Sequence, residues 1–135
     1  MDKYKVILVD DEAEVIDVIE QKIAWNELGF EVVGSATNGV KALELVEKTQ
    51  PDVVITDIKM PYMDGLELSK RLNDDYRNIH IIIFTGFDEF EYAKEAVHLE
   101  VEEYMLKPIN SDELTECLKR VKNSLDLERE EKLNV

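Results

Sequence analysis

Short apolar runs recur along the chain and alternate with longer stretches in which apolar residues are spaced by three or four. The short runs are rich in β-branched residues and end in polar or turn-forming residues, as do strands buried on both faces of a parallel sheet. The longer stretches have the periodicity of helices with one apolar face. We predict strands at residues 5–9, 31–36, 53–56, 80–84 and 101–106.

The predicted helices follow the strands one by one. Ile16, Ile19 and Ile23 give the first helix an inner face, and Gly29 suits its C-cap. The last helix repeats leucine or valine at helical spacing, and we expect Ser111 to cap it. The predicted helices cover residues 12–27, 40–48, 66–73 and 88–97, and a final stretch from residue 111.

Strand–helix units of this length predict a parallel sheet with helices on both faces. Right-handed crossovers restrict the topology further. The expected fold is α/β: a three-layer, doubly wound, flavodoxin-like (βα)5 domain with a five-stranded parallel sheet in the order 2-1-3-4-5. We expect residues 1–125 to form this domain and residues 126–135 to be a helical linker or tail that extends the last helix.

The composition supports one folded domain. Of the 135 residues, 44% are hydrophobic and 35% are charged, and the formal net charge is −15. Such an acidic chain is by itself a poor ligand for nucleic acid. The single cysteine, Cys117, excludes an internal disulfide and suits a reducing cytoplasm, where we expect the protein to be. No apolar stretch approaches the roughly 20 residues of a membrane span, so we expect no membrane contact.

Acidic residues end two of the predicted strands: Asp10 and Asp11 the first, and Asp57 the third. These strands are neighbours in the predicted order, so the carboxylates meet at the carboxyl edge of the sheet. Converging carboxylates repel one another unless a cation neutralises them, and Mg²⁺ prefers such oxygen ligands. Thr85 and Lys107 end the fourth and fifth strands and bring a hydroxyl and an ammonium to the same edge.

A carboxylate surrounded by Mg²⁺, an ammonium and a hydroxyl is an arrangement that neutralises phosphoryl oxygens. The carboxylate itself is a nucleophile toward phosphorus, and the product is an aspartyl phosphate. The chemistry inferred from these residues is therefore phosphoryl transfer to Asp57.

Five short motifs at the strand ends resemble those of the receiver domain of bacterial two-component response regulators. They occur in the family's order, and the resemblance covers about residues 3–125. The stretch at residues 85–93 is similar to receivers fused to a C-terminal helix-turn-helix DNA-binding domain of the AraC type. The motifs are Val9-Asp10-Asp11-Glu12, Asp57-Ile58-Lys59-Met60-Pro61, Asp64-Gly65, Thr85-Gly86 and Tyr104-Met105-Leu106-Lys107-Pro108.

The resemblance implies that Asp57 is the phospho-acceptor and takes the phosphoryl group from a phosphohistidine on a sensor histidine kinase. It also implies a Mg²⁺ site. Asp11 and Asp57 match its side-chain ligands, Lys59 would add its backbone carbonyl, and Asp10 matches the acid that acts partly through metal-bound water. Lys107 matches the lysine that contacts the acceptor and then the phosphoryl oxygens.

Two residues match the conformational switch of the family. Thr85 matches the hydroxyl that moves toward the phosphoryl group, and Tyr104 matches the aromatic residue that then turns inward. Pro108 matches a proline whose preceding peptide bond is cis. Phe87 stands where a bulky ring hinders hydrolytic water, so we expect slow autodephosphorylation rather than the turnover of a conventional enzyme.

The resemblance also implies how the signal leaves the domain. Family members relay it through a face made by the fourth helix, the fifth strand and the last helix, by forming a homodimer or by releasing an effector. We expect the chain to serve transcription regulation as the receiver portion of a longer protein. DNA would be contacted only through a C-terminal output domain that is absent from this chain.

The alternative function is a degenerate receiver that acts as a phosphorylation-independent protein-interaction module, and the presence of every site residue disfavours it. A haloacid-dehalogenase-type phosphatase needs a second acid where this chain has Lys59. A nucleotide or flavin binder needs a glycine-rich first turn. We interpret Glu12 mainly as a first-turn acid of its helix, and His80 and His98, which lack partners at metal-ligand spacing, as structural residues.

Overall fold

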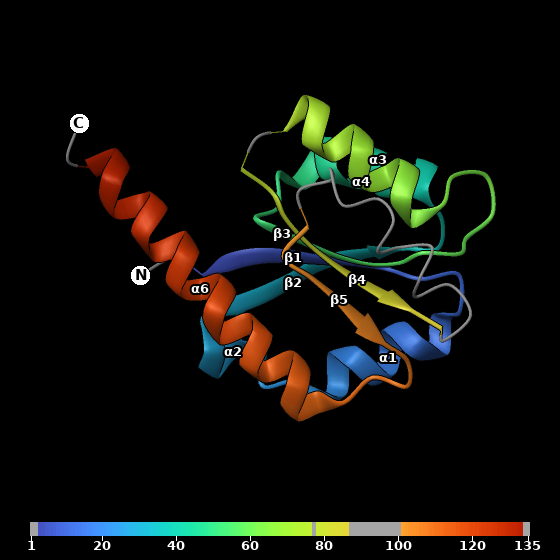
Figure 1. The fold of residues 1–135 in the computed structure, drawn as a ribbon, viewed down its shortest axis with the longest axis horizontal. Helices are drawn as coiled ribbons and strands as arrows, with labels where there is room; N and C mark the ends of the chain where they lie inside the picture. The colour runs from blue at the N-terminus through green and yellow to red at the C-terminus, as the bar shows by residue number, and fades with distance from the viewer. Residues whose placement is uncertain (1–2, 77, 87–100, 134–135) are drawn as a thin grey trace.

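The computed structural model describes residues 3–76, 78–86 and 101–133 (Figure 1). Its centre is a five-stranded sheet in the order β2-β1-β3-β4-β5, and all neighbouring strands are parallel. This confirms the predicted fold class and strand order, although β5 begins two residues later than expected. The strands are β1 (Tyr4–Val9), β2 (Phe30–Ala36), β3 (Val53–Asp57), β4 (His80–Thr85) and β5 (Glu103–Leu106).

Helices cover both faces of the sheet and make the three predicted layers (Figure 1). On one face lie α3 (Gly39–Thr49) and α4 (Gly65–Asp75), and on the other α1 (Ala13–Lys22), α2 (Trp25–Leu28) and α6 (Ser111–Leu133). The helix predicted for residues 88–97 and the residue Phe87 lie outside the described residues. No helix in the described part of the chain is both long and apolar enough to cross a membrane.

The continuous apolar run of β1 supplies side chains to both cores. Val6 and Leu8 pack in the core on the side of α1 and α6, whereas Ile7 and Val9 pack in the core on the side of α3 and α4. This division follows from the pleat, because successive side chains of a strand point to opposite faces. Each fully buried side chain of this size stabilises the fold by about 1.5–3 kcal/mol relative to its exposed state.

The single helix predicted for residues 12–27 is wrong, because it divides into α1 and α2. The break lies at Ile23, whose backbone is extended with φ −102° and ψ 135°. Ile23 and Trp25 are both buried. In a continuous helix, two residues this far apart point in directions about 200° apart, so one of them would face water. The extended residue lets both side chains reach the core.

The last helix, α6, runs to Leu133 and buries Leu114, Leu118 and the other apolar residues of its inner face. Its capping residue is Asn110 and not the predicted Ser111. The Asn110 side chain accepts a hydrogen bond from the N–H of Glu113 at 3.0 Å. The helix therefore includes most of the predicted tail, and the boundary between domain and linker near residue 125 remains a prediction.

Candidate functional site

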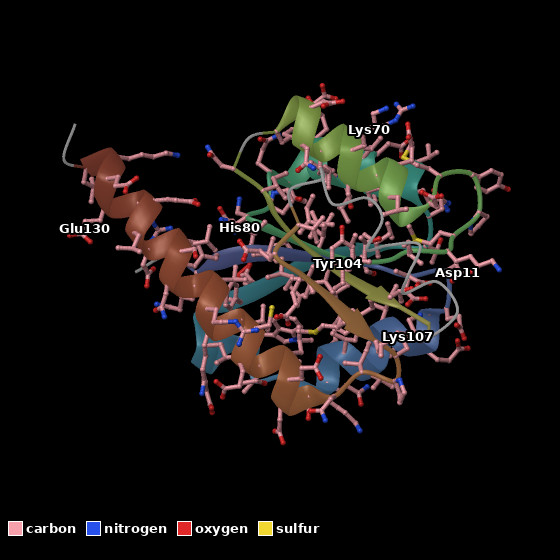
Figure 2. All side chains as sticks on the ribbon, in the orientation of Figure 1. Asp11, Lys70, His80, Tyr104, Lys107 and Glu130 are labelled. Carbon is pink, nitrogen blue, oxygen red and sulfur yellow. The ribbon has the colours of Figure 1, made fainter. Side chains whose placement is uncertain are left out.

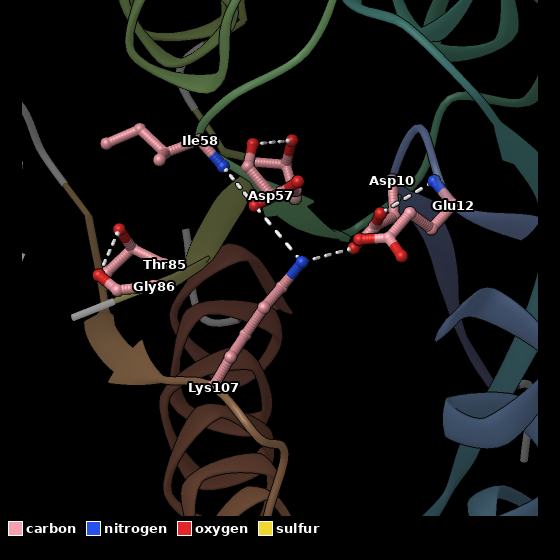
Figure 3. A network of polar contacts seen from close by, with 8 residues as sticks. Asp10, Glu12, Asp57, Ile58, Thr85, Gly86 and Lys107 are labelled. Atoms are coloured by element: carbon pink, nitrogen blue, oxygen red, sulfur yellow. Dashed lines mark hydrogen bonds and ion pairs between the residues drawn. The ribbon is translucent and has the colours of Figure 1, made fainter. Parts of the chain in front are cut away.

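The carboxyl ends of the parallel strands bring the predicted site residues to one edge of the sheet (Figure 3). β1 is paired with β3, so Asp10 and Asp57 lie at adjacent strand ends. β4 is paired with β5, so Thr85 lies at the end of β4 and Lys107 just beyond β5. Four side chains that are distant in sequence thus share one edge.

Lys107 joins the two acidic strand ends. Its Nζ lies 2.9 Å from Oδ2 of Asp10 and 3.3 Å from Oδ1 of Asp57, and Figure 3 shows the ammonium between the two carboxylates. Asp10 is 3% and Asp57 7% exposed, but the Lys107 side chain is 22% exposed, so water screens these contacts in part. Burial opposes the charge of Lys107, but the hydrogen bond to Asp10 and the charges of both carboxylates outweigh it and raise the pKa of Lys107. The peptide bond between Lys107 and Pro108 is cis, as the resemblance implies.

The charge of the Asp57 carboxyl is only partly compensated. Burial, together with the neighbouring charge of Asp10, raises the pKa of Asp57 to about 6. Lys107 and the backbone N–H of Ile58, which donates to Oδ1 at 2.9 Å, offset part of this rise. At neutral pH the carboxyl is still mostly ionised, so it can act as a nucleophile. Any further positive charge at the carboxyl edge of the sheet would also stabilise the ionised form of Asp57.

The raised pKa of Asp57 predicts that stability falls with rising pH. Between the ordinary value of 3.8 and the folded value of about 6, the folded state holds the proton more tightly than the unfolded state does. Full conversion of this difference gives roughly 3 kcal/mol, and contact of the site with water reduces it to about 1–2 kcal/mol.

Urea unfolding without divalent cations measures this effect at about pH 4 and about pH 7. The quantity to compare is the unfolding free energy of Asp57→Asn minus that of the unaltered protein. We expect this difference to be about 1–2 kcal/mol larger at about pH 7 than at about pH 4. If this difference were the same at both pH values, burial of the Asp57 charge would not be the cause of the pH dependence.

The acidic edge fits a hard divalent cation. Carboxylate oxygens of Asp10, Asp11 and Glu12 lie within 4.8 Å of one another. An oxygen-only set of this kind suits Mg²⁺. Asp57 is not a member of this close group and is connected to it through Lys107 and Asp10. Glu12 stands at the N-cap of α1, where a negative charge suits the helix dipole, although its side chain makes no capping hydrogen bond. Its carboxylate also belongs to this close group.

The loop after β3 is anchored to the end of that strand through Gly65. The Gly65 N–H donates to the Ile58 carbonyl at 2.7 Å. A Cβ at Gly65 would lie 2.2 Å from the Asp57 carbonyl oxygen, so only glycine fits this position. The side chain of Asp64 caps α4. Lys59 is exposed at the start of this loop, and the role of its backbone carbonyl remains a prediction.

The predicted switch residues lie on adjacent strands, Thr85 on β4 and Tyr104 on β5. Thr85 is fully buried, and its hydroxyl donates to the Gly86 carbonyl at 3.2 Å rather than to Asp57 (Figure 3). Tyr104 packs against the core on the side of α3 and α4, and burial raises the pKa of its hydroxyl. That buried hydroxyl has no hydrogen-bond partner within the described residues. The coupled movement of the pair remains a prediction.

The comparisons with known proteins agree with this geometry. The family model for the response regulator receiver domain matches residues 6–119. The REC domain of AraT, a response regulator from Geobacillus stearothermophilus, has 44% sequence identity and a TM-score of 0.89, with 93% of this chain and 98% of that one covered. A two component transcriptional regulator AraC from Clostridium phytofermentans ISDg has 30% identity and a TM-score of 0.87, over 94% and 98% of the two chains.

The curated relatives are longer than this chain. The transcriptional regulatory protein YesN of Bacillus subtilis, described as uncharacterized, is 43% identical over 118 residues, which are 87% of this chain and 32% of YesN. The chain spans about a third to a half of the length of the curated relatives it matches. Family model, sequence relatives and fold all lead to one assignment: the chain belongs to the family of response regulator receiver domains.

Proposed function

We propose that Asp57 accepts a phosphoryl group from a phosphohistidine on a sensor histidine kinase. The observation that carries this proposal is the Lys107 ammonium, which contacts both Asp57 and Asp10 at the carboxyl edge of the sheet. The acceptor carboxylate is thereby buried next to a positive charge that can also bind phosphoryl oxygens. Family membership supports the choice of donor, because response regulators receive their phosphoryl groups from histidine kinases.

In the proposed reaction an Asp57 carboxylate oxygen attacks phosphorus. A P–O bond forms, the P–N bond of the phosphohistidine breaks, and its electron pair returns to the donor imidazole. Lys107, whose Nζ is 3.3 Å from Oδ1 of Asp57, then compensates the charge of the transferred oxygens. Hydrolysis of the acyl phosphate at Asp57 restores the carboxylate, slowly if Phe87 hinders water.

The residues that would hold Mg²⁺ are Asp11 and Asp57 through their carboxylates, Lys59 through its backbone carbonyl, and Asp10 through water. When bound, the cation neutralises phosphoryl oxygens. The support in this structure is the close group of carboxylates at the end of β1, together with the raised pKa of Asp57. Glu12 also belongs to that group.

For the output, we propose that Thr85 and Tyr104 change position together and that the chain serves transcription regulation. The names of its relatives, which are transcriptional regulatory proteins, support this role. A homodimer through the face that includes β5 and α6 is part of the proposal, and the rest of that face lies at residues 88–97, outside the described part. DNA contact and a cytoplasmic location are likewise proposed, the former only through a C-terminal output domain.

The metal requirement can be tested with a small phosphodonor such as acetyl phosphate. In the presence of Mg²⁺ we expect the intact mass to rise by one phosphoryl group, and with a chelator the rate should fall at least about a hundredfold. Mass spectrometry of the intact chain measures both. No gain under either condition contradicts phosphoryl acceptance and favours the interaction-module alternative. Equal gain under both conditions contradicts the Mg²⁺ site.

A further inference from the structure

The final turns of α6 contact the amino-terminal edge of the sheet, opposite to the phosphoryl site. The Tyr4 hydroxyl, at the start of β1, donates to Oδ1 of Asp126 at 2.5 Å, and the guanidinium carbon of Arg129 lies 4.5 Å from the centre of the Tyr4 ring. The hydrogen bonds from Tyr4 and Lys122 lower the pKa of Asp126, so this carboxylate stays charged. Residues 126–129, predicted as linker, are thus packed against the domain.

His80, at the start of β4, makes a second connection to the same helix. Its Nε2 lies 3.0 Å from Oε1 of Glu128 on α6, and its Nδ1 contacts Oε1 of Glu102 just before β5. The His80 side chain is 11% exposed, whereas those of Glu102 and Glu128 are 32% and 42% exposed, so the ring is largely enclosed while both carboxylates still contact water. Figure 2 shows His80 at the end of the sheet away from Asp11 and Lys107.

The geometry around His80 depends on protons. An imidazole with a carboxylate at each ring nitrogen donates to both only when both nitrogens carry a proton. The neutral ring has a single N–H, so its other nitrogen presents a lone pair to a carboxylate and that contact becomes repulsive. The contact between Tyr4 and Asp126 has no such dependence near neutral pH, because burial and this hydrogen bond raise the pKa of Tyr4 to about 12.

We propose that the amino-terminal edge of the sheet, at Tyr4 and His80, is a docking surface for the end of α6, and that His80, Glu102 and Glu128 form a proton-dependent latch on it. With His80 charged, the latch holds the turn at residues 126–129 against the domain. As pH rises and the ring loses its proton, the contact to Glu128 is lost and these last turns detach more often. The latch therefore stabilises the attachment of the end of α6 fully at low pH, and this stabilisation disappears as pH rises.

Within the described residues, the titratable groups that face His80 are Glu102 and Glu128. Asp57, whose pKa burial raises to about 6, also changes charge within the pH range of the test, but it lies at the opposite edge of the sheet. His98 lies outside the described residues. A substitution at His80 is thus needed to separate the pH effect of His80 from those of Asp57 and His98. The other residues that line the pocket beside His80 do not titrate: Asn78, Ile79, Ile81 and Val101.

The latch can be tested by backbone amide hydrogen exchange in residues 126–133 of the 135-residue chain, followed by NMR. The measurement runs from about pH 5.5 to about pH 8.5, across the range in which histidine side chains change charge. Intrinsic exchange rates are taken from a peptide of the same sequence. We expect protection to fall about fivefold toward high pH in the unaltered protein, as a charged hydrogen bond is lost. In His80→Gln, protection should be low and nearly independent of pH.

Two further variants on α6 complete the test. Glu128→Gln removes the charge that pairs with His80. In this variant we expect the exchange protection of residues 126–133 at low pH to fall to the level seen in His80→Gln. Glu130→Gln makes the same change at an exposed position of the same helix and should keep the profile of the unaltered protein. If Glu130→Gln behaves like Glu128→Gln, the effect comes from general charge and the latch is refuted.

The ring ¹⁵N shifts of His80 provide a measurement that needs no variant. We expect two protonated ring nitrogens at low pH and one at high pH, with the loss of protection in residues 126–133 at the same midpoint. The proposal is overturned if protection stays constant while the ring titrates, or if the unaltered protein and His80→Gln lose protection in parallel.

Discussion

Asp57→Asn is expected to abolish phosphoryl incorporation, reducing its rate by at least about a thousandfold, the order found when an essential nucleophile is removed. Asparagine has nearly the shape of aspartate, and its side-chain oxygen can still accept from the Ile58 N–H, which donates to Asp57 at 2.9 Å. The amide, however, lacks the anionic oxygen that attacks phosphorus. The variant therefore tests chemistry with little change in packing.

The measurement is intact mass after incubation with acetyl phosphate and Mg²⁺. Asp74→Asn is a matched control, because it makes the same change at an exposed position on α4, and it should gain the phosphoryl group at the normal rate. If Asp57→Asn still gains one phosphoryl group, the acceptor is another residue, and the role assigned to the end of β3 is wrong.

Gly65→Ala is expected to have the largest effect on the architecture of the site. The new Cβ would lie 2.2 Å from the Asp57 carbonyl oxygen and 2.8 Å from the Ile58 Cα. Both contacts are with backbone, so the loop after β3 must move and the 2.7 Å hydrogen bond from Gly65 to Ile58 is lost. We expect a loss of about 3 kcal/mol of unfolding free energy. In the fraction that folds, displacement of the acceptor by about 1 Å should slow phosphoryl gain about a hundredfold.

Gly34→Ala is the control for this experiment. There the three atoms nearest to the Cβ belong to the side chain of Leu45, the closest at 3.0 Å, and the end of that side chain can rotate away. We expect a loss of about 1 kcal/mol at most and a normal rate of phosphoryl gain. Urea unfolding and intact mass measure the two quantities. If Gly65→Ala proved as stable and as active as Gly34→Ala, the close approach of α4 to the acceptor strand would not constrain the site.

The fold could be predicted from the sequence because its central strands, β1, β3 and β4, are buried on both faces. Val6 and Leu8 serve one core, and Ile7 and Val9 the other, so β1 is recognisable as a continuous apolar run. The site was predictable for a related reason. Its polar residues come directly after such runs, and parallel strands collect their carboxyl ends at one edge.

The break between α1 and α2, the cap of α6 and the partners of His80 could not be predicted in this way, because they depend on contacts that only the folded chain makes. The break between α1 and α2 arises because Ile23 and Trp25 both reach the core, which helical periodicity alone does not reveal. Asn110 and Ser111 are both good capping residues, and only the path of the chain into α6 selects Asn110. The partners of His80 are 22 and 48 residues away in sequence, so its two carboxylates become visible only in the folded chain.

The length of α6 gives the domain a mechanical property. The helix begins four residues after Lys107, beside the proposed phosphoryl site, and ends beyond the opposite edge of the sheet (Figure 1). With 23 residues it is about 34 Å long, so a tilt of about 5° at its first turn displaces its far end by about 3 Å. A small change of direction at its first turn would therefore displace the far end most, and that end is the part that the contacts of Tyr4 and His80 hold against the sheet.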